Sequence, residues 1–172
     1  MSSFNIINDS CVNQNVDAIV NAANGYMSHG GGVARAILLK AGAELNTACR
    51  KFRLPISDGE CISTPAFNIK NAKVIIHAVG PDFGSTPDAF DKLKSAYYNS
   101  LIELKNYNLH SISFPLISAS IFAGNLKNAV TITTKYCKEA YNDFLSNYKD
   151  YNIDVYLCCY DKKEYDEAIS VK

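Results

Sequence analysis

The stretch of the chain that decides its fold is residues 16–34, which read VDAIVNAANGYMSHGGGVA. The apolar run Ala18-Ile19-Val20 ends at asparagines that favour turns, so it predicts a short buried strand. Three consecutive glycines follow, and apolar residues then recur at helical spacing over residues 31–48. A buried strand, a glycine-rich loop and a helix in this order are typical of an α/β fold.

The rest of the chain repeats this alternation on both sides of the stretch. Apolar runs predict further strands at residues 4–7, 61–65, 74–79, 112–114 and 155–159. Amphipathic segments predict helices at residues 87–106 and 126–144, and a last short helix at 162–170. The alternation predicts a mostly parallel central sheet with helices on both faces. No repeat or linker interrupts it, so residues 1–172 are expected to form one domain.

The charge balance and hydropathy of the chain argue against two classes of protein. Lysine plus arginine and aspartate plus glutamate both number 17, and a long nucleic-acid track would need an excess of positive charge. No apolar run approaches the ~18 residues of a membrane helix, and the N-terminus lacks the pattern of a signal peptide. We expect a protein without membrane contacts, cytoplasmic, or nucleocytoplasmic if its source is a eukaryote. We also expect a monomer.

The six cysteines show no spacing typical of a metal site or a redox site. No C-x-x-C pair is present, and Cys158 and Cys159 are adjacent, too close for an ordinary disulfide or a metal clip. They are expected to be buried free thiols in a reducing compartment. Neither a metal nor a cofactor is expected.

Two loops that follow predicted strands carry unusual chemistry, residues 21–32 and 115–125. Open α/β sheets bind ligands at the carboxyl ends of their strands. Glycines before a helix let the backbone approach a ligand, and N–H groups at a helix N-terminus favour phosphate. The spacing matches neither G-x-x-x-x-G-K-[ST] nor G-x-G-x-x-G, so neither a P-loop nor a dinucleotide-binding fingerprint is supported. The alternative is a flexible glycine turn without a ligand.

Residues 16–24, followed by His29-Gly30-Gly31-Gly32-Val33-Ala34, resemble the signature of the macrodomain family. Three further segments agree in order and spacing, namely residues 58–60, 74–81 and 114–118. The resemblance extends over roughly residues 4–160. It implies a three-layer α/β/α sandwich with a mixed, mostly parallel central sheet and a cleft that binds ADP-ribose.

The resemblance also implies roles for individual residues. It places Asp9 at the adenine amino group, which its carboxylate suits as an acceptor, with Ser10 beside it. It places Asn24 at the distal ribose, where an amide both donates and accepts. It makes Asn21 a support of this loop and a ligand-binding residue that lines the site less directly. Asp9 and Ser10 are alternatively cap residues, and Asn24 a residue that stabilises a turn.

The diphosphate is expected to lie between the two loops. The backbone from Gly30 to Val33 forms one side, and the resemblance assigns the other to the second loop. The expected binding residues are Gly30, Gly31, Gly32, Val33, Ser118, Ala119, Ser120, Ile121 and Phe122. Phe122 is expected to pack against the distal ribose, with ordinary core packing as the alternative. The family pattern has glycines where this chain has Ser120 and Ala123, so a differently shaped loop is an open alternative.

The family contains both enzymes and non-catalytic readers of ADP-ribose. MacroD-type hydrolases have an aspartate and a histidine where this chain has Ala34 and Leu38, which favours a reader. The His29–Ala34 pattern resembles the coronavirus-like and ADP-ribosyltransferase-linked branch, in which activity is kept without the aspartate. We favour an enzyme that removes mono-ADP-ribose from acidic side chains of modified proteins, with weak ADP-ribose 1″-phosphatase activity.

Two residues carry the catalytic assignment. Asn24 would orient the ribose for a water held by a phosphate, and His29 would shape the ribose pocket or assist proton transfer. The alternative is that His29 only packs in the loop. His77, inside an apolar strand, is interpreted as a core histidine, and His110 as a surface residue. Binding of poly(A) or another nucleic acid through the adenine pocket is a third hypothesis, which the neutral charge disfavours.

Overall fold

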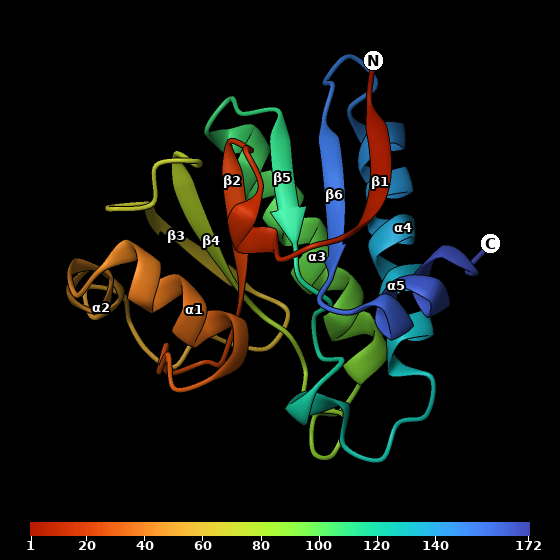
Figure 1. Ribbon diagram of the computed structural model, residues 1–172, viewed down its shortest axis with the longest axis horizontal. Helices are drawn as coiled ribbons and strands as arrows, with labels where there is room; N and C mark the ends of the chain where they lie inside the picture. The colour runs from red at the N-terminus through yellow and green to blue at the C-terminus, as the bar shows by residue number, and fades with distance from the viewer.

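The computed structural model describes residues 1–172 and contains one six-stranded sheet in the order β1-β6-β5-β2-β4-β3 (Figure 1). The strands are β1 (Ser3–Asn8), β2 (Ala18–Ala23), β3 (Cys61–Pro65), β4 (Val74–Val79), β5 (Ser111–Phe114) and β6 (Asp154–Cys159). The helices are α1 (Gly32–Ala41), α2 (Glu44–Cys49), α3 (Ala89–Asn106), α4 (Ala129–Asn147) and α5 (Lys162–Ile169), with short 3-10 turns η1 (Cys11–Asn13) and η2 (Ile121–Ala123).

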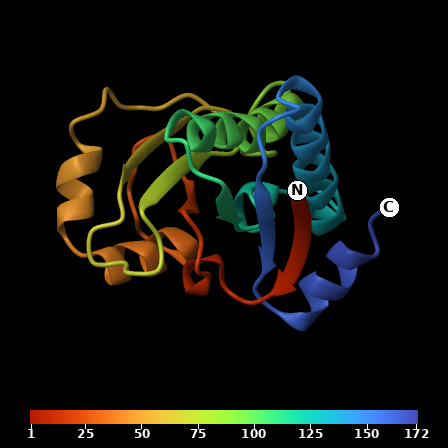
Figure 2. The same cartoon turned by 90° about the horizontal axis from the view of Figure 1, so that it is seen from above.

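All neighbouring strands pair in parallel except β3, which pairs antiparallel with β4 at one end of the sheet. The carboxyl ends of β1, β2, β4, β5 and β6 therefore lie along one edge. Figure 2 shows helices on both sides of the sheet, with α1 and α2 on one face and α3 and α4 on the other. The predicted three-layer sandwich with a mixed, mostly parallel sheet is confirmed.

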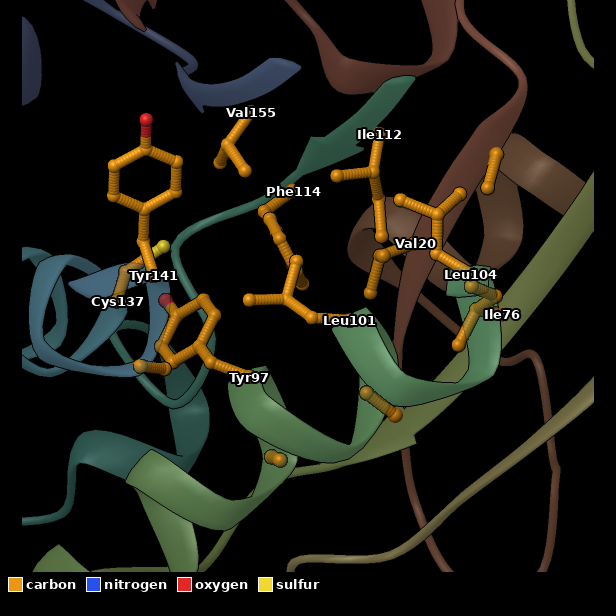
Figure 3. Packing of buried hydrophobic residues seen from close by; sticks show 14 of the residues in the cluster. Val20, Ile76, Tyr97, Leu101, Leu104, Ile112, Phe114, Cys137, Tyr141 and Val155 are labelled. Atoms are coloured by element: carbon orange, nitrogen blue, oxygen red, sulfur yellow. The ribbon is translucent and has the colours of Figure 1, made fainter. Parts of the chain in front are cut away.

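The core consists of two apolar clusters, one on each face of the sheet. On β4, which is buried along its whole length, Ile76 joins the cluster beneath α3 and α4, and Ile75 joins the cluster beneath α1 and α2. Successive strand residues point to opposite faces, so a strand covered on both sides is apolar throughout. Figure 3 shows Tyr97, Leu101 and Leu104 of α3 packed towards the sheet.

The predicted helix at residues 31–48 is wrong in one respect, because two helices occupy that segment. Gly42 has φ of 100°, a conformation that favours glycine, and it ends α1 before α2 begins at Glu44. The helix predicted at residues 126–144 begins later, at Ala129, because Asn128 adopts a left-handed conformation. The apolar spacing spans both breaks and so could not reveal them.

The remaining observations on the fold concern the cysteines and helix hydrophobicity. All six cysteines are free, and each is buried except the half-buried Cys61. None of the helices is both long enough and apolar enough to span a bilayer.

Asp17, which directly precedes β2, ties that strand to the segment before β5. Its Oδ2 accepts hydrogen bonds from the backbone N–H groups of His110, at 2.9 Å, and Ser111, at 3.3 Å. Its Oδ1 lies 3.6 Å from Nζ of Lys73. Burial raises the pKa of Asp17, but the His110 and Ser111 amides and the Lys73 ammonium outweigh this and hold the pKa below its ordinary value.

We expect replacement of Asp17 to destabilise the fold. Asp17→Ala should lower the free energy of unfolding by about 1–3 kcal/mol at pH 7, because two backbone donors lose their acceptor. Asp17→Asn keeps a carbonyl acceptor and should cost less. A carboxylate with a lowered folded pKa stabilises above its unfolded pKa, so the difference between wild type and Asp17→Asn should shrink as the pH falls below 3.8. Urea unfolding of wild type, Asp17→Ala and Asp17→Asn at pH 7 and at a pH below 3.8 checks this. A stability difference between wild type and Asp17→Asn that does not change with pH would contradict it.

Candidate functional site

The loops that leave the carboxyl edge of the sheet bring the predicted ligand residues to one side of the molecule. Residues 9–10 follow β1, residues 24–31 follow β2, and residues 115–120 follow β5. Residues 80–88, which follow β4, leave the same edge. Because these strands are parallel and belong to one sheet, the loops gather there, around the lower part of Figure 1.

The β2–α1 loop, residues 24–31, is folded around the side chain of Asn24. Oδ1 of Asn24 accepts from the N–H groups of Tyr26 and Ser28, each at 3.1 Å. Its Nδ2 donates to the Ser28 carbonyl at 3.0 Å and to Ser28 Oγ at 2.7 Å. The amide has two donor hydrogens and two acceptor lone pairs, so its hydrogen-bonding capacity is filled within the loop. A ribose hydroxyl that bound Asn24 would have to replace a contact with Tyr26 or Ser28.

The three glycines at the end of this loop are exposed and leave open space above them. A Cβ added at Gly30, Gly31 or Gly32 would meet nothing within 4 Å. Gly31 is the N-cap residue of α1, and no side chain caps this end of the helix. Gly32 has φ of 57°, which favours glycine. The first N–H groups of α1 are therefore free to receive an anion that lies against the glycines.

The second loop, residues 115–125, packs against residues 80–88, which follow β4. Ser118 is buried, has φ of 61°, and its Oγ donates to the carbonyl of Pro81 at 2.6 Å. The N–H of Phe83 donates to the carbonyl of Phe122 at 2.8 Å. A Cβ at Gly80 would come within 2.4 Å of Ile117 and 2.5 Å of Ser118 Oγ, so only glycine fits there. The Ser118 hydroxyl thus faces the protein and is engaged by Pro81.

The two positions without the family's glycines do not need them in this loop. Ser120 has φ of −117°, and Ala123 lies in η2, whereas the left-handed positions are Ser118 and Gly124. Neither position has a positive φ, so neither requires glycine for a left-handed backbone. Ile121 is 90% exposed at the tip of the loop, and Phe122 is half-buried.

Asp9 is exposed at the end of β1 and makes local hydrogen bonds. Oδ1 accepts from the N–H of Ser10 at 2.7 Å and from Asn13 Nδ2 at 3.0 Å, and Oδ2 accepts from Gln14 Nε2 at 3.2 Å. The Asn13 amide and the Ser10 N–H hold the pKa of Asp9 below its ordinary value. The Ser10 hydroxyl caps η1 by accepting from the N–H of Val12. Asp9 is therefore an ionised carboxylate, and Oδ2 still has a lone pair for a donor.

His29 points from the first loop into the protein. Its ring is 6% exposed, its Nε2 lies 3.7 Å from Cys49 Sγ, and its Nδ1 has no partner. His77 of β4 lies beneath it, with the ring centroids 5.7 Å apart. His77 is fully buried, as predicted, and its pKa is lowered to about 3 by burial and by the nearby His29. Burial also lowers the pKa of His29 and raises that of Cys49.

Asn21 is also buried, on β2 opposite His77 in the register of the two strands. Its Nδ2 lies 3.0 Å from Nδ1 of His77, whose Nε2 lies 3.1 Å from Thr64 Oγ1 on β3. Asn21 thus supports the strand beneath the first loop and has no exposed surface with which to line a site. Its assignment as a ligand-binding residue stays a prediction, as do those of Asn24 and His29.

Two cavities of similar size are present, so volume alone does not locate the site. One of about 440 Å³ lies beneath the first loop and is lined by Tyr26, Met27, Ser28, His29, Gly30, Leu38, Asn46, Cys49, Arg50 and Leu54. The other, also about 440 Å³, lies between β1, α4 and α5, and its lining includes Phe4, Lys138 and Ile169. The second contains none of the predicted residues. We take the loop chemistry, not the volume, to mark the site.

No pattern in the sequence points to the residues that surround His29 and Asn24. Cys49 and Thr64 approach His29 and His77 only in the folded chain, and Ser28 carries no motif that marks it as a partner of Asn24. Only Gly80 had a signal, since it belongs to the segment at residues 74–81 that supported the resemblance.

Comparison with known sequences agrees with this architecture. The sequence model of the Macro domain family matches residues 20–133. An uncharacterized protein of Saccharolobus solfataricus is 39% identical over 160 residues, which cover 90% of this chain and 84% of the relative. An uncharacterized protein of Pyrococcus abyssi is 35% identical over 181 residues, covering 98% and 96% of the two chains.

Solved structures show the same fold. A macrodomain of Oceanobacillus iheyensis with ADP superimposes with a TM-score of 0.84 at 31% identity, covering 96% of this chain and 87% of that one. A Trypanosoma brucei macrodomain in complex with ADP-ribose superimposes with a TM-score of 0.84 at 26% identity, covering 97% and 68%. The family match, the relatives and the shared fold together show that this chain belongs to the macrodomain family.

Proposed function

We propose that this chain binds ADP-ribose at the carboxyl edge of its sheet, between the β2–α1 loop and the second loop. The observation that carries the proposal is the run of three exposed glycines that leads into the uncapped N-terminus of α1. Free backbone N–H groups and open space suit a diphosphate, which needs donors and no added positive charge. The Oceanobacillus iheyensis macrodomain, solved with ADP and, as a mutant, with ADP-ribose, supports it.

In this proposal the adenine lies at Asp9 and the distal ribose lies by the first loop. The ionised Asp9 accepts from the adenine amino group through Oδ2, which has one hydrogen bond in the structure, from Gln14. The second loop lies on the other side of the proposed diphosphate position. Its Ser118 hydroxyl is bonded to the carbonyl of Pro81, so contacts with the diphosphate would come from the backbone of the loop.

We further propose that the chain removes mono-ADP-ribose from acidic side chains of modified proteins. A water held by a phosphate of the ligand would attack the anomeric carbon, the bond from that carbon to the carboxylate oxygen would break, and the proton would leave through the phosphate. Asn24 would orient the ribose. The burial of His29 favours its role in shaping the loop over a role in proton transfer.

The second candidate function is a reader that binds ADP-ribose on a partner protein and performs no chemistry. The filled hydrogen-bonding capacity of Asn24 favours it, since Ser28 occupies both donor hydrogens of the amide. Ala34 favours it as well, because this buried residue of α1 offers no carboxylate to activate a water.

The binding proposal predicts that a methyl group at Gly30 blocks the ligand without harming the protein. Gly30→Ala adds a Cβ that meets no protein atom within 4 Å, so the thermal unfolding temperature should stay unchanged. ADP-ribose affinity, measured by calorimetry, should fall at least tenfold, about 1.4 kcal/mol. Leu39→Ala, on the exposed face of α1, serves as the control and should bind as the wild type does. Equal affinity in Gly30→Ala would place the diphosphate elsewhere.

The choice between enzyme and reader is tested on a protein that is mono-ADP-ribosylated on glutamate, with loss of the label followed on a gel. If the chain is an enzyme, the wild type should remove the label and Asn24→Ala should not. Ser28→Ala is the informative control, because it frees one donor hydrogen of Asn24 and should retain or increase the activity. Retained label with all three proteins, together with calorimetric binding of free ADP-ribose, would establish the reader.

A further inference from the structure

Beneath the β2–α1 loop, three side chains with metal-binding atoms converge from three different elements. His29 belongs to the loop, Cys49 is the last residue of α2, and His77 belongs to β4. Cys49 Sγ lies 3.7 Å from His29 Nε2 and 4.0 Å from His77 Nε2. The ligand atoms of all three lie within 4.8 Å of one another, and all three residues are buried.

These separations approach those of a tetrahedral zinc site. Zn–S bonds of about 2.3 Å and Zn–N bonds of about 2.0–2.1 Å place a sulfur and a nitrogen about 3.6 Å apart. The two sulfur–nitrogen distances here, 3.7 and 4.0 Å, are close to that value. The two histidine nitrogens, which lie within 4.8 Å of each other, would have to move to about 3.3 Å apart. His29 lies in a loop rather than in a strand or helix, so its ring is the member of the cluster that can make this movement.

The donor set also has the chemistry of a zinc site. One thiolate and two neutral imidazoles are ligands that Zn²⁺ prefers, and three protein ligands leave a fourth position for water. The cavity of about 440 Å³ is lined by both His29 and Cys49, so it offers room for that water. Binding would displace the thiol proton of Cys49 to solvent, since the thiolate is the form that coordinates.

Hydrogen bonds within the protein satisfy both ring nitrogens of His77 but not every polar atom around the cluster. Nδ1 of His29 and Oδ1 of Asn21 are buried without any partner, although buried polar atoms are nearly always paired. Asn21 stands beside Nδ1 of His77, and rotation of its amide would bring Oδ1 to accept from an N–H at that nitrogen. This would fix the tautomer of His77 whose Nε2 carries a lone pair, as the outer partners of metal-bound histidines do. Thr64 Oγ1, 3.1 Å from Nε2, would then give way to the ion.

We propose that Cys49 Sγ and the Nε2 atoms of His29 and His77 bind one Zn²⁺ ion, with a water from the cavity as the fourth ligand. The ion would tie the β2–α1 loop to α2 and β4 from below, on the side opposite the exposed glycines. The proposal does not rest on ADP-ribose binding, because the three ligand residues are buried, whereas the glycines proposed to receive the diphosphate are exposed.

The test uses chelator-treated full-length protein with Zn²⁺ or Co²⁺ added. Wild type should retain one zinc per chain after gel filtration. Its Co²⁺ form should show sulfur-to-cobalt charge transfer in the near ultraviolet and the strong visible bands of tetrahedral Co²⁺. Cys49→Ser should lose the charge-transfer band and most of the bound zinc. Cys61→Ser is the matched control, because this half-buried thiol packs on the opposite face of the sheet and should bind as wild type does.

A stability measurement separates metal binding to the folded site from binding to exposed thiols of the unfolded chain. Zn²⁺ at about 100 times its dissociation constant should raise the unfolding temperature of wild type and Cys61→Ser by about 5–10 °C. His29→Gln, which changes only the loop, should bind the ion at least tenfold more weakly and remain folded by circular dichroism. No retained zinc, equal retention by Cys49→Ser, or Co²⁺ spectra without the sulfur band would overturn the proposal.

Discussion

The pairing of β2 with β4 is the constraint on which the rest of the structure depends. In this register Asn21 lies opposite His77, and the two buried side chains meet at 3.0 Å within the sheet. A slip of one strand by one residue would turn its polar side chain to the opposite face and leave both side chains unpaired in the core, at a cost of about 1–3 kcal/mol each. The polar pair therefore fixes where both strands end, and with them the start of the β2–α1 loop and the position of Gly80.

The positions of the loops at the carboxyl edge depend on these two strand ends, because the loops pack closely against them. Gly80 comes directly after β4, and its lack of a side chain lets Ile117 and Ser118 lie against its backbone. Ser118 can then donate to Pro81, and Phe83 to Phe122, so the second loop rests on the first residues after β4. The second loop is thus held by contacts with a neighbouring strand end. Its positive-φ residues are Ser118 and Gly124, so Ser120 and Ala123 do not occupy positions that call for glycine.

The sequence predicted the strands well because burial on both faces leaves a continuous apolar run, as in β4. The break between α1 and α2 could not be predicted, because it depends on one backbone angle at Gly42 while the apolar spacing continues through it. The resemblance placed Asp9, the glycines and the second loop at one edge of the sheet. The cluster beneath the loop had no such signal, since Cys49 is separated from His29 by 20 positions and from His77 by 28. Only the folded arrangement of loop, helix and strand brings the three together.

The burial pattern of the β2–α1 loop determines which of its residues can reach a ligand at the outer surface. From Met27 to Gly30, buried and exposed residues alternate, so Met27 and His29 point into the protein while Ser28 and Gly30 face outward. His29 could turn towards a ligand only if the loop inverted, which would bury Ser28 and withdraw the glycines that are proposed to receive the phosphate. The imidazole and the glycine backbone therefore serve opposite faces of the loop. Catalysis at the outer face would depend on Asn24 and on groups of the ligand itself, while His29 packs against Cys49 and His77 on the inner face.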